Sequence, residues 1–171
     1  MGRHLIVDGY NLARSGALFL LEDPAGPEGR EELCALLSGY ARGKGFRLTV
    51  VFDGRGAGTP GRTRHAFKGG NMVFSSRAET ADDVIRDLSR SAPAGTVVVT
   101  SDRGLGGTLR GREATVVSCE EFAGRLAAFQ AEKTKGAVGE ETDDGRRKGK
   151  KGEGQKKKKR DRARNRLLRK L

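Results

Sequence analysis

Short apolar runs alternate along this chain with longer segments of helical periodicity. The runs at residues 4–7, 47–52, 71–74, 96–100 and 114–117 are rich in large apolar side chains, which is typical of strands buried on both faces. Because helical segments separate these runs, the pattern predicts an α/β fold. We expect a mostly parallel central sheet covered by helices on both sides.

The helical segments carry apolar residues at spacings of three and four. In residues 31–42, Leu33, Leu37 and Tyr40 fall on one face, as an amphipathic helix requires. Between the second and third strands, residues 54–70 are rich in glycine and predict a long flexible loop. Further helices are expected over residues 81–90 and 120–132, with a short helix or turn over 103–109.

Charge and hydrophobicity divide the chain near residue 132. Residues 1–132 carry 17 Lys and Arg against 16 Asp and Glu, whereas residues 133–171 carry 17 against 6. Apolar residues also become scarce in the second part. We therefore expect a globular domain over 1–132 and a Lys/Arg-rich disordered tail over 133–171. Such a tail is either a solvated arm or a salt-sensitive attachment to nucleic acid or the ribosome.

Cysteine usage and hydropathy bear on the compartment. Cys34 and Cys119 are the only cysteines, and neither has the spacing of a zinc site. No apolar stretch approaches the roughly 20 residues that cross a bilayer, and a strand is expected within five residues of the first Met. These features predict a cytoplasmic protein without a membrane partner, and they carry no signal for its oligomeric state.

Aspartates follow four of the predicted strands. Asp8 and Asp53 come directly after the first two strands, Asp82 opens the helix after the third, and Asp102 follows the fourth. Parallel strands place their carboxyl ends at one edge of a sheet, where α/β proteins bind ligands. Carboxylates gathered there repel one another unless a cation lies between them. The pattern predicts a site for Mg²⁺ or Mn²⁺, which favour oxygen ligands.

Ordinary structural roles compete with this interpretation. Asp-Gly is a turn dipeptide, in which Gly9 lets the chain turn sharply after Asp8. Thr80 and Asp83 have the spacing of a capping box at a helix start. One acid of the pair is explained in that way, so Asp82 is the preferred ligand, and Asp83 is left as either ligand or cap.

Two polar neighbours are supporting candidates. Asn11 either caps the turn after the first strand or holds Asp8 or a metal-bound water. Ser101 either orients Asp102 or caps the helix that follows. The sequence contains no Ser-His-Asp arrangement, no phosphate-binding P-loop and no intact dinucleotide fingerprint. The acids are therefore the main chemical signal in the chain.

Four blocks occur in order: Asp-Gly-Tyr-Asn at 8–11, Val-Phe-Asp-Gly at 51–54, and the acidic segments at 79–85 and 99–105. Together they resemble the YacP-like NYN-domain ribonucleases, a branch of the PIN and 5′-nuclease-like superfamily, over residues 3–130. They are also similar to metal-binding segments in the 5′-nuclease domain of bacterial DNA polymerase I. The resemblance implies a PIN-like (NYN) three-layer sandwich that cleaves phosphodiester bonds with Mg²⁺ or Mn²⁺.

The resemblance further implies an endoribonuclease that cuts messenger RNA in association with the ribosome. Gly104 departs from the pattern, because polymerase-type nucleases usually carry a further acid at that position. One ion or two are therefore both compatible with the motif. Carried over by motif, the metal ligands would be Asp8, Asp53, Asp82, Asp83 and Asp102, with Asn11 in support. Asp8, Asp53, Asp82 and Asp102 would be the catalytic residues, and Ser101 stays a supporting candidate.

RNA contacts are expected from the cations of the long loop, of the fourth strand's end and of the tail. Two other functions stay open: a non-catalytic RNA- or ribosome-binding module that uses only the tail, and a phosphatase of the haloacid dehalogenase type. The phosphatase typically needs Asp-x-Asp, and Tyr10 occupies its second acidic position. The expected RNA-binding residues are Arg55, Arg62, Arg64, Lys68, Arg103, Lys156, Lys157, Lys158, Lys159 and Arg160.

Overall fold

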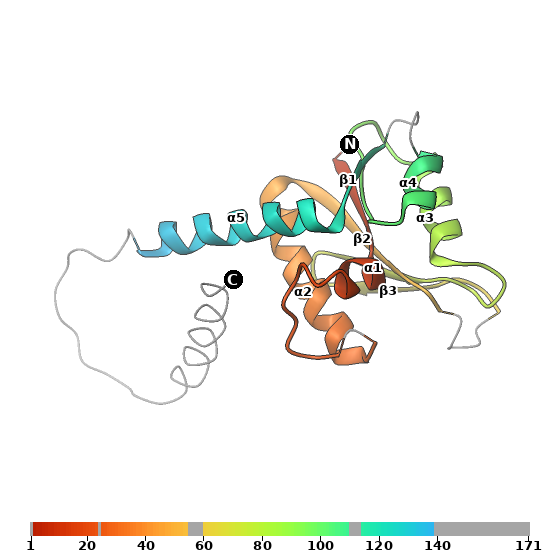
Figure 1. The fold of residues 1–171 in the computed structure, drawn as a ribbon, viewed down its shortest axis with the longest axis horizontal. Coiled ribbons are helices and arrows are strands. Elements are labelled where there is room, and N and C mark those ends of the chain that lie inside the picture. The colour runs from red at the N-terminus through yellow and green to blue at the C-terminus, as the bar shows by residue number, and fades with distance from the viewer. Residues whose placement is uncertain (1, 24, 55–59, 110–113, 139–171) are drawn as a thin grey trace. The chain divides into compact units, whose positions relative to one another are not determined.

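The structure is a computed structural model that describes residues 2–23, 25–54, 60–109 and 114–138 (Figure 1). The chain divides into two units, residues 1–132 and 133–171, and the sheet belongs to the first. The tail was expected to be disordered from residue 133, which is wrong for residues 133–138, because they belong to a helix over Cys119–Val138. Residues 139–171 lie outside the described part, and there the expected disorder stays a prediction.

One six-stranded sheet forms the centre of the first unit. Its strands are β1 (Arg3–Asp8), β2 (Phe46–Phe52), β3 (Thr63–Phe67), β4 (Gly70–Phe74), β5 (Val97–Val99) and β6 (Thr115–Val117). They lie in the order β3-β4-β2-β1-β5-β6. Every neighbouring pair is parallel except β3 and β4, which pair antiparallel at one edge. The predicted α/β fold with a mostly parallel sheet is confirmed.

Helices cover both faces of this sheet. They are α1 (Gly9–Arg14), α2 (Pro27–Lys44), α3 (Ala81–Arg90), α4 (Arg103–Leu109) and α5 (Cys119–Val138). Side chains of α1, α2 and α5 share one hydrophobic core with the sheet, and those of α3 and α4 share another. Within the described residues, no helix has both the length and the apolarity to cross a bilayer.

Strand β1 contributes side chains to both hydrophobic cores. Leu5 and Val7 face the core under α2 and α5, whereas Ile6 faces the core under α3 and α4, and all three are fully buried. Successive side chains of a strand point to opposite faces. A strand with a helical layer on each side therefore needs apolar residues at every position.

Helix α2 begins earlier and ends later than the predicted range of 31–42. Pro27 is suited to its first turn, because the missing N–H has no intrahelical partner there. Gly45 ends it in the left-handed conformation, with φ of 70°. The predicted inward face is confirmed, since Leu33 and Leu37 are fully buried.

The prediction of a loop over residues 54–70 is wrong in part. Thr63–Phe67 forms strand β3, and Gly69, with φ of 104°, completes its turn into β4. Strand β3 lies at the edge of the sheet, and three of its five residues are exposed. An edge strand that is open to water on this scale shows no continuous apolar run, which is why its sequence resembled a loop.

The two Asp-Gly pairs have a reason different from the predicted sharp turn. Gly9 begins helix α1 and does not have a positive φ. A Cβ atom on Gly9 would lie 2.3 Å from the ring of Phe52, and one on Gly54 would lie 2.2 Å from the carbonyl oxygen of Ser75. Glycine is therefore required at both positions by close packing beside the strand ends.

This packing predicts opposite effects for two glycine substitutions. Gly54→Ala would force β2 away from the backbone at Ser75, so we expect the free energy of unfolding to fall by about 1–3 kcal/mol. Gly39→Ala adds a Cβ within α2 that meets nothing within 4 Å, and it should raise stability by up to about 1 kcal/mol. Urea unfolding measures both, and an equal effect of the two substitutions would contradict the packing argument.

Candidate functional site

The carboxyl-terminal edge of the sheet opens onto a cavity of about 540 Å³. Asp8 reaches it from β1, Asp53 from the end of β2, and Asp82 from the first turn of α3. Three acids that are far apart in the sequence therefore line one hollow. Their convergence follows from the parallel pairing of the strands, which brings these ends together.

Asp8 is the most buried of these acids, with 7% of its surface exposed. It caps α1, because its carboxylate accepts a hydrogen bond of 3.0 Å from the backbone N–H of Asn11. Burial raises the pKa of Asp8 to about 6; the Asn11 bond opposes the shift, and repulsion from Asp82, Asp102 and Asp53 adds to it. The charged form of Asp8 is therefore disfavoured mainly by burial and further by the neighbouring acids.

Asp82 shares this electrostatic environment. Burial raises its pKa, and the charge of Asp102 raises it further. Arg86 acts in the opposite direction, with its guanidinium 3.7 Å from the Asp82 carboxylate. The charged forms of Asp8 and Asp82 are therefore both disfavoured, first by burial and then by the charges of Asp102 and Asp53.

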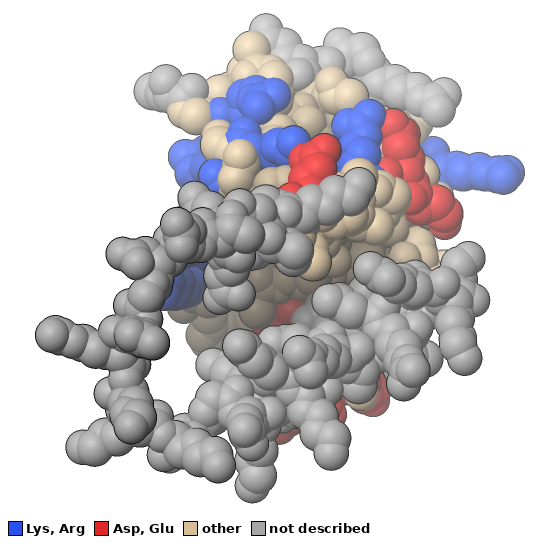
Figure 2. Space-filling view, turned by 90° about the vertical axis from the view of Figure 1, so that its left-hand side faces the viewer, with Lys and Arg blue, Asp and Glu red and all other residues tan. Residues whose placement is uncertain are grey.

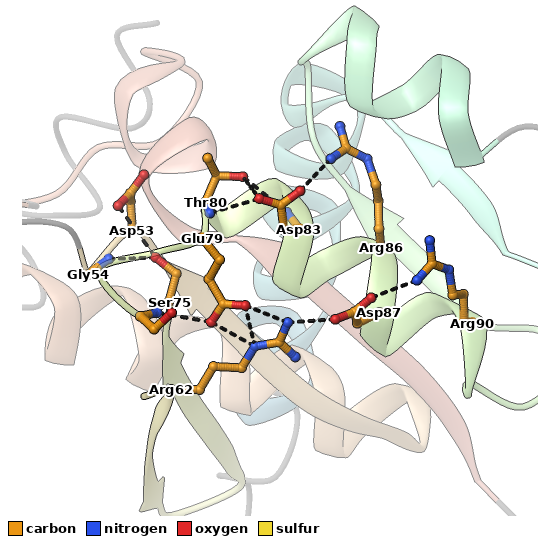
Figure 3. Close-up of polar contacts among 11 residues, drawn as sticks. Asp53, Gly54, Arg62, Ser75, Glu79, Thr80, Asp83, Arg86, Asp87 and Arg90 are labelled. Carbon is orange, nitrogen blue, oxygen red and sulfur yellow. Dashed lines mark hydrogen bonds and ion pairs between the residues drawn. The ribbon is translucent and has the colours of Figure 1, made fainter. Parts of the chain in front are cut away.

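Asp53 is positioned by the neighbouring strand. The hydroxyl of Ser75 lies 3.5 Å from the Asp53 carboxylate and accepts a hydrogen bond of 3.0 Å from the N–H of Gly54 (Figure 3). Ser75 itself follows β4 and is fully buried. The place of Asp53 at the cavity therefore depends on the fit between the ends of β2 and β4.

Asp102 caps helix α4, a structural role that does not require a metal ion. Its carboxylate accepts a hydrogen bond of 2.8 Å from the N–H of Leu105, and its carbonyl accepts one of 2.9 Å from Gly106, so it caps α4. Asp102 and Arg103 are exposed and line an adjoining hollow of about 680 Å³ instead of the first cavity. Asp102 still acts on Asp8 and Asp82 through its charge.

Of the two roles left open for Asp83, metal ligand or helix cap, the structure shows that it caps α3. One carboxylate oxygen accepts hydrogen bonds from the backbone N–H and the hydroxyl of Thr80, at 3.0 and 2.8 Å, and the other pairs with Arg86 at 2.9 Å (Figure 3). The Thr80 N–H holds the pKa of Asp83 below its usual value. Asp83 does not line the cavity. The capping box thus occupies the atoms that a metal ion would need.

The two supporting candidates connect the elements around the cavity. The Asn11 side-chain oxygen accepts hydrogen bonds from the N–H of Ser101, at 2.9 Å, and from the thiol of Cys119, at 3.1 Å. The Ser101 hydroxyl donates to Glu120 and accepts from the Cys119 N–H, both at 2.9 Å. These bonds fasten α1, the end of β5 and the start of α5 to one another.

Several residues that line the cavity were not proposed from the sequence, among them Tyr10, Arg14 and Glu120. Arg14 lies in the last turn of α1, with its guanidinium 5.1 Å from the Tyr10 ring centre. Arg14 follows Asn11 by three residues, and this spacing places the two side chains on one face only if the segment is a helix. The sequence indicated a turn here, so Arg14 was not connected with the site. Glu120 was interpreted only as the start of the final helix.

Arg62, an expected RNA contact, is engaged within the protein. Its guanidinium pairs with Glu79 at 2.7 Å and with Asp87 at 2.6 Å (Figure 3). The pairing raises the pKa of Arg62 and lowers the pKa of Glu79 to about 2. Arg64, Lys68 and Arg103 are exposed. The remaining candidates lie outside the described residues, namely Arg55, Lys156, Lys157, Lys158, Lys159 and Arg160.

The donor set fits a hydrated divalent cation. Within the described parts of the chain, no three His, Cys, Asp or Glu side chains are close enough together to hold an ion directly. The cavity nevertheless offers carboxylate oxygens from Asp8, Asp53, Asp82 and Glu120. Mg²⁺ prefers oxygen ligands and usually keeps several of its waters. Carboxylates that line one cavity could therefore hold such an ion through its waters.

Comparison with known proteins identifies the family. Residues 5–171 match the YacP-like NYN domain. The chain belongs to the YacP-like NYN domain family. Its fold is similar to that of Rae1 (YacP) from Bacillus subtilis, with a TM-score of 0.62 and 24% identity over 79% of each chain. A Rae1 mutant with leucine in place of one tryptophan gives a TM-score of 0.61 and 24% identity over 82% of this chain and 86% of that one.

No curated protein matches the chain. The solved structures show the fold, and the NYN domain is of the nuclease type. The fold and family that the sequence motifs predicted are therefore confirmed. The individual roles of the acids rest on the geometry of the cavity.

The raised pKa of Asp8 predicts how the stability of the metal-free protein depends on pH. Between about pH 4 and pH 6 the folded state binds more protons at Asp8 than the unfolded state, so its contribution to stability falls as pH rises through this window. Asp8→Asn removes the charge and keeps an oxygen that can cap α1. At pH 7.5 in chelator we expect it to raise the free energy of unfolding by on the order of 2 kcal/mol.

Urea unfolding at pH 7.5 and pH 4 measures this effect, and the difference between Asp8→Asn and the parent should vanish near pH 4. Asp23→Asn is the control, because Asp23 is exposed and does not line the cavity. A destabilising effect of Asp8→Asn at pH 7.5 would show that burial does not penalise the Asp8 charge.

Proposed function

We propose that this protein is a divalent-metal-dependent endoribonuclease that hydrolyses phosphodiester bonds of RNA, with Mg²⁺ or Mn²⁺ as its cofactor. The observation that carries the proposal is the cluster of Asp8, Asp53, Asp82 and Asp102, whose charges act on one another at the edge of a nuclease-type fold. Such a field is unfavourable without a cation, and the membership in the NYN family supports a hydrolase of the nuclease type.

The mechanism assigns distinct tasks to the residues of the cavity. Asp8, Asp53 and Asp82 would hold the ion directly or through waters, with Asp102 acting at its margin. When bound, the ion would activate a water and neutralise the charge that develops on the leaving oxygen. The N–H of Asn11 fixes the orientation of the Asp8 carboxylate.

Arg14 is the cationic side chain among the lining residues. A guanidinium can bind two oxygens of one phosphate at once. We infer that Arg14 contacts the scissile phosphate, and that its position over the Tyr10 ring limits where that phosphate lies. Ser101 and Glu120 also line the cavity and share a hydrogen bond of 2.9 Å.

The basic tail supports RNA as the substrate, and we propose that this RNA is messenger RNA on the ribosome. On the face shown in Figure 2, lysine and arginine side chains alternate with acidic ones across the described surface. The domain over residues 1–132 carries a net charge of +1, and the rest of the chain carries +11. Dense positive charge attracts any RNA backbone without reading its sequence. We place this activity in the cytoplasm.

A non-catalytic RNA-binding module is the second candidate. The absence of three directly ligating side chains within the described residues favours it. A chain that ends at Val138 separates the two functions, because it keeps α5 and the cavity and removes residues 139–171. We expect it to retain metal-dependent cleavage with weaker RNA binding. Loss of all activity with the tail would favour the module.

Substitution of single acids tests the catalytic assignment. Asp8→Asn and Asp82→Asn should each lower the cleavage rate by more than about 100-fold, since even residues behind metal ligands typically contribute 10–100-fold. RNA affinity in chelator should stay unchanged. Asp83→Asn is the matched control, because this neighbouring acid belongs to the capping box. Equal loss of rate in all three variants would contradict the division between cavity and cap.

The reaction class is tested with end-labelled RNA and DNA of the same sequence, each incubated with Mg²⁺, Mn²⁺ or chelator. We expect internal fragments from RNA with either metal, little cleavage of DNA and none in chelator. Stepwise shortening from one end would instead indicate an exonuclease. Cleavage that persists in chelator would rule out the metal-dependent mechanism.

A further inference from the structure

A second hollow, of about 740 Å³, lies between α2 and the β3–β4 hairpin. We name it the hairpin groove. Arg30 and Arg42 line it from α2, and His65, Phe67 and Lys68 line it from the hairpin. None of these residues lines the cavity that Asp8, Asp53 and Asp82 share, which we call the acidic cavity.

The charge of the hairpin groove is opposite to that of the acidic cavity. Arg30, Arg42 and Lys68 line it together with one carboxylate, that of Glu31. Arg42 and Lys68 are exposed. The groove therefore presents an excess of positive charge to a ligand, as a phosphate backbone requires.

The cations are spaced along the groove by the helix itself. Arg30, Cys34, Ser38 and Arg42 follow one another at intervals of four, which places them in one stripe on α2. At 1.5 Å per residue, the two arginines begin about 18 Å apart along the axis. At about 3.4 Å per stacked nucleotide, this length corresponds to about five nucleotides.

The hairpin supplies an apolar and aromatic wall. Phe67, Met72 and Phe74 are half-buried and line the groove. The exposed ring of His65 meets the Phe74 ring edge to face, with centroids 5.8 Å apart. Proteins that bind single strands combine a basic groove with aromatic side chains on which bases stack.

The hairpin groove adjoins the acidic cavity through Tyr10. The Arg30 guanidinium donates a hydrogen bond of 3.2 Å to the Tyr10 hydroxyl, and Tyr10 lines the cavity. The Tyr10 ring packs against Phe52 at 5.0 Å, and Phe52 stacks on Phe74 at 5.6 Å. A row of aromatic rings thus connects the two hollows.

We propose that the hairpin groove binds the single-stranded RNA segment next to the phosphate being cleaved. The proposal rests on the proposed function for its link to cleavage. Arg42 and Lys68 bind backbone phosphates, and bases stack along the wall that His65 and Phe67 form. A double helix does not fit this role, because its base faces are stacked inside and cannot reach an apolar wall. The groove therefore selects unpaired RNA.

Binding of a 12-nucleotide single-stranded RNA to the full chain tests the proposal. The titrations are done in chelator, so they do not depend on cleavage, and are repeated over a range of salt concentrations. Each phosphate contact on a single strand contributes about 0.7 to the slope of log affinity against log salt. The double variant Arg42→Ala/Lys68→Ala should reduce that slope by about 1.4. The double variant Arg77→Ala/Arg90→Ala removes the same charge outside the groove and should leave the slope at the parent value.

The aromatic wall is tested by His65→Ala, which alters an exposed side chain. We expect it to weaken binding of the single strand by about fivefold or more, and to leave binding of a duplex of equal length unchanged. Equal losses for single strand and duplex would overturn the stacking role. Equal salt slopes for the two double variants would overturn the groove.

Cleavage by the parent protein, measured separately with Mn²⁺, distinguishes failure of the groove from failure of the proposed function. If the parent protein cuts RNA and both double variants keep its salt slope, the groove proposal is contradicted and the proposed nuclease function stands. If the Arg42→Ala/Lys68→Ala variant lowers the salt slope but the parent protein cuts no RNA, only the proposed nuclease function is contradicted. If the parent protein binds no single-stranded RNA, both proposals are contradicted.

Discussion

Parallel pairing of β1 with β2 and β5 is the constraint on which the rest of this structure depends. In this register Val7 lies opposite Val50 on one side and Val99 on the other. The three strands therefore end at the same level, and the residues that follow them meet at one edge. Asp8 lies at the centre of that edge, with an acid-bearing segment on each side.

This arrangement places like charges together where burial already disfavours them. The pKa of Asp8 is raised to about 6, chiefly by burial. Capping of α1 by Asp8 offsets part of that cost through the Asn11 N–H. Glycines at 9 and 54 allow the adjacent backbone to approach Phe52 and Ser75 closely. The fold thus holds the acids in an unfavourable state, as functional sites commonly do, and a cation would relieve it.

The sheet edge formed by β3 gives the protein a second kind of surface. Strand β3 lies at the edge of the sheet, and three of its five residues are exposed beside α2. Arg30 belongs to this surface and also contacts Tyr10 in the acidic cavity. Negative and positive hollows are therefore neighbours on one domain. The proposed RNA substrate would use both, because a cation would bind in the first hollow and the flanking phosphate backbone in the second.

The sequence by itself determined the buried strands, the parallel sheet and the position of acids at strand ends, because strand burial and strand termination are local patterns. It left Asp83 open between ligand and cap, and it missed strand β3. Only the tertiary structure assigned Asp83 to Thr80 and Arg86, paired Arg62 with Glu79 and Asp87, and brought Arg14 and Glu120 to the cavity. The Asp83 contacts are local, because Thr80 and Arg86 each lie three residues away at the same helix start. The other outcomes depend on which side chains meet across elements distant in sequence or on the surface of an edge strand. Hydrophobic periodicity carries no record of those encounters, because it reports only which face of a segment is buried.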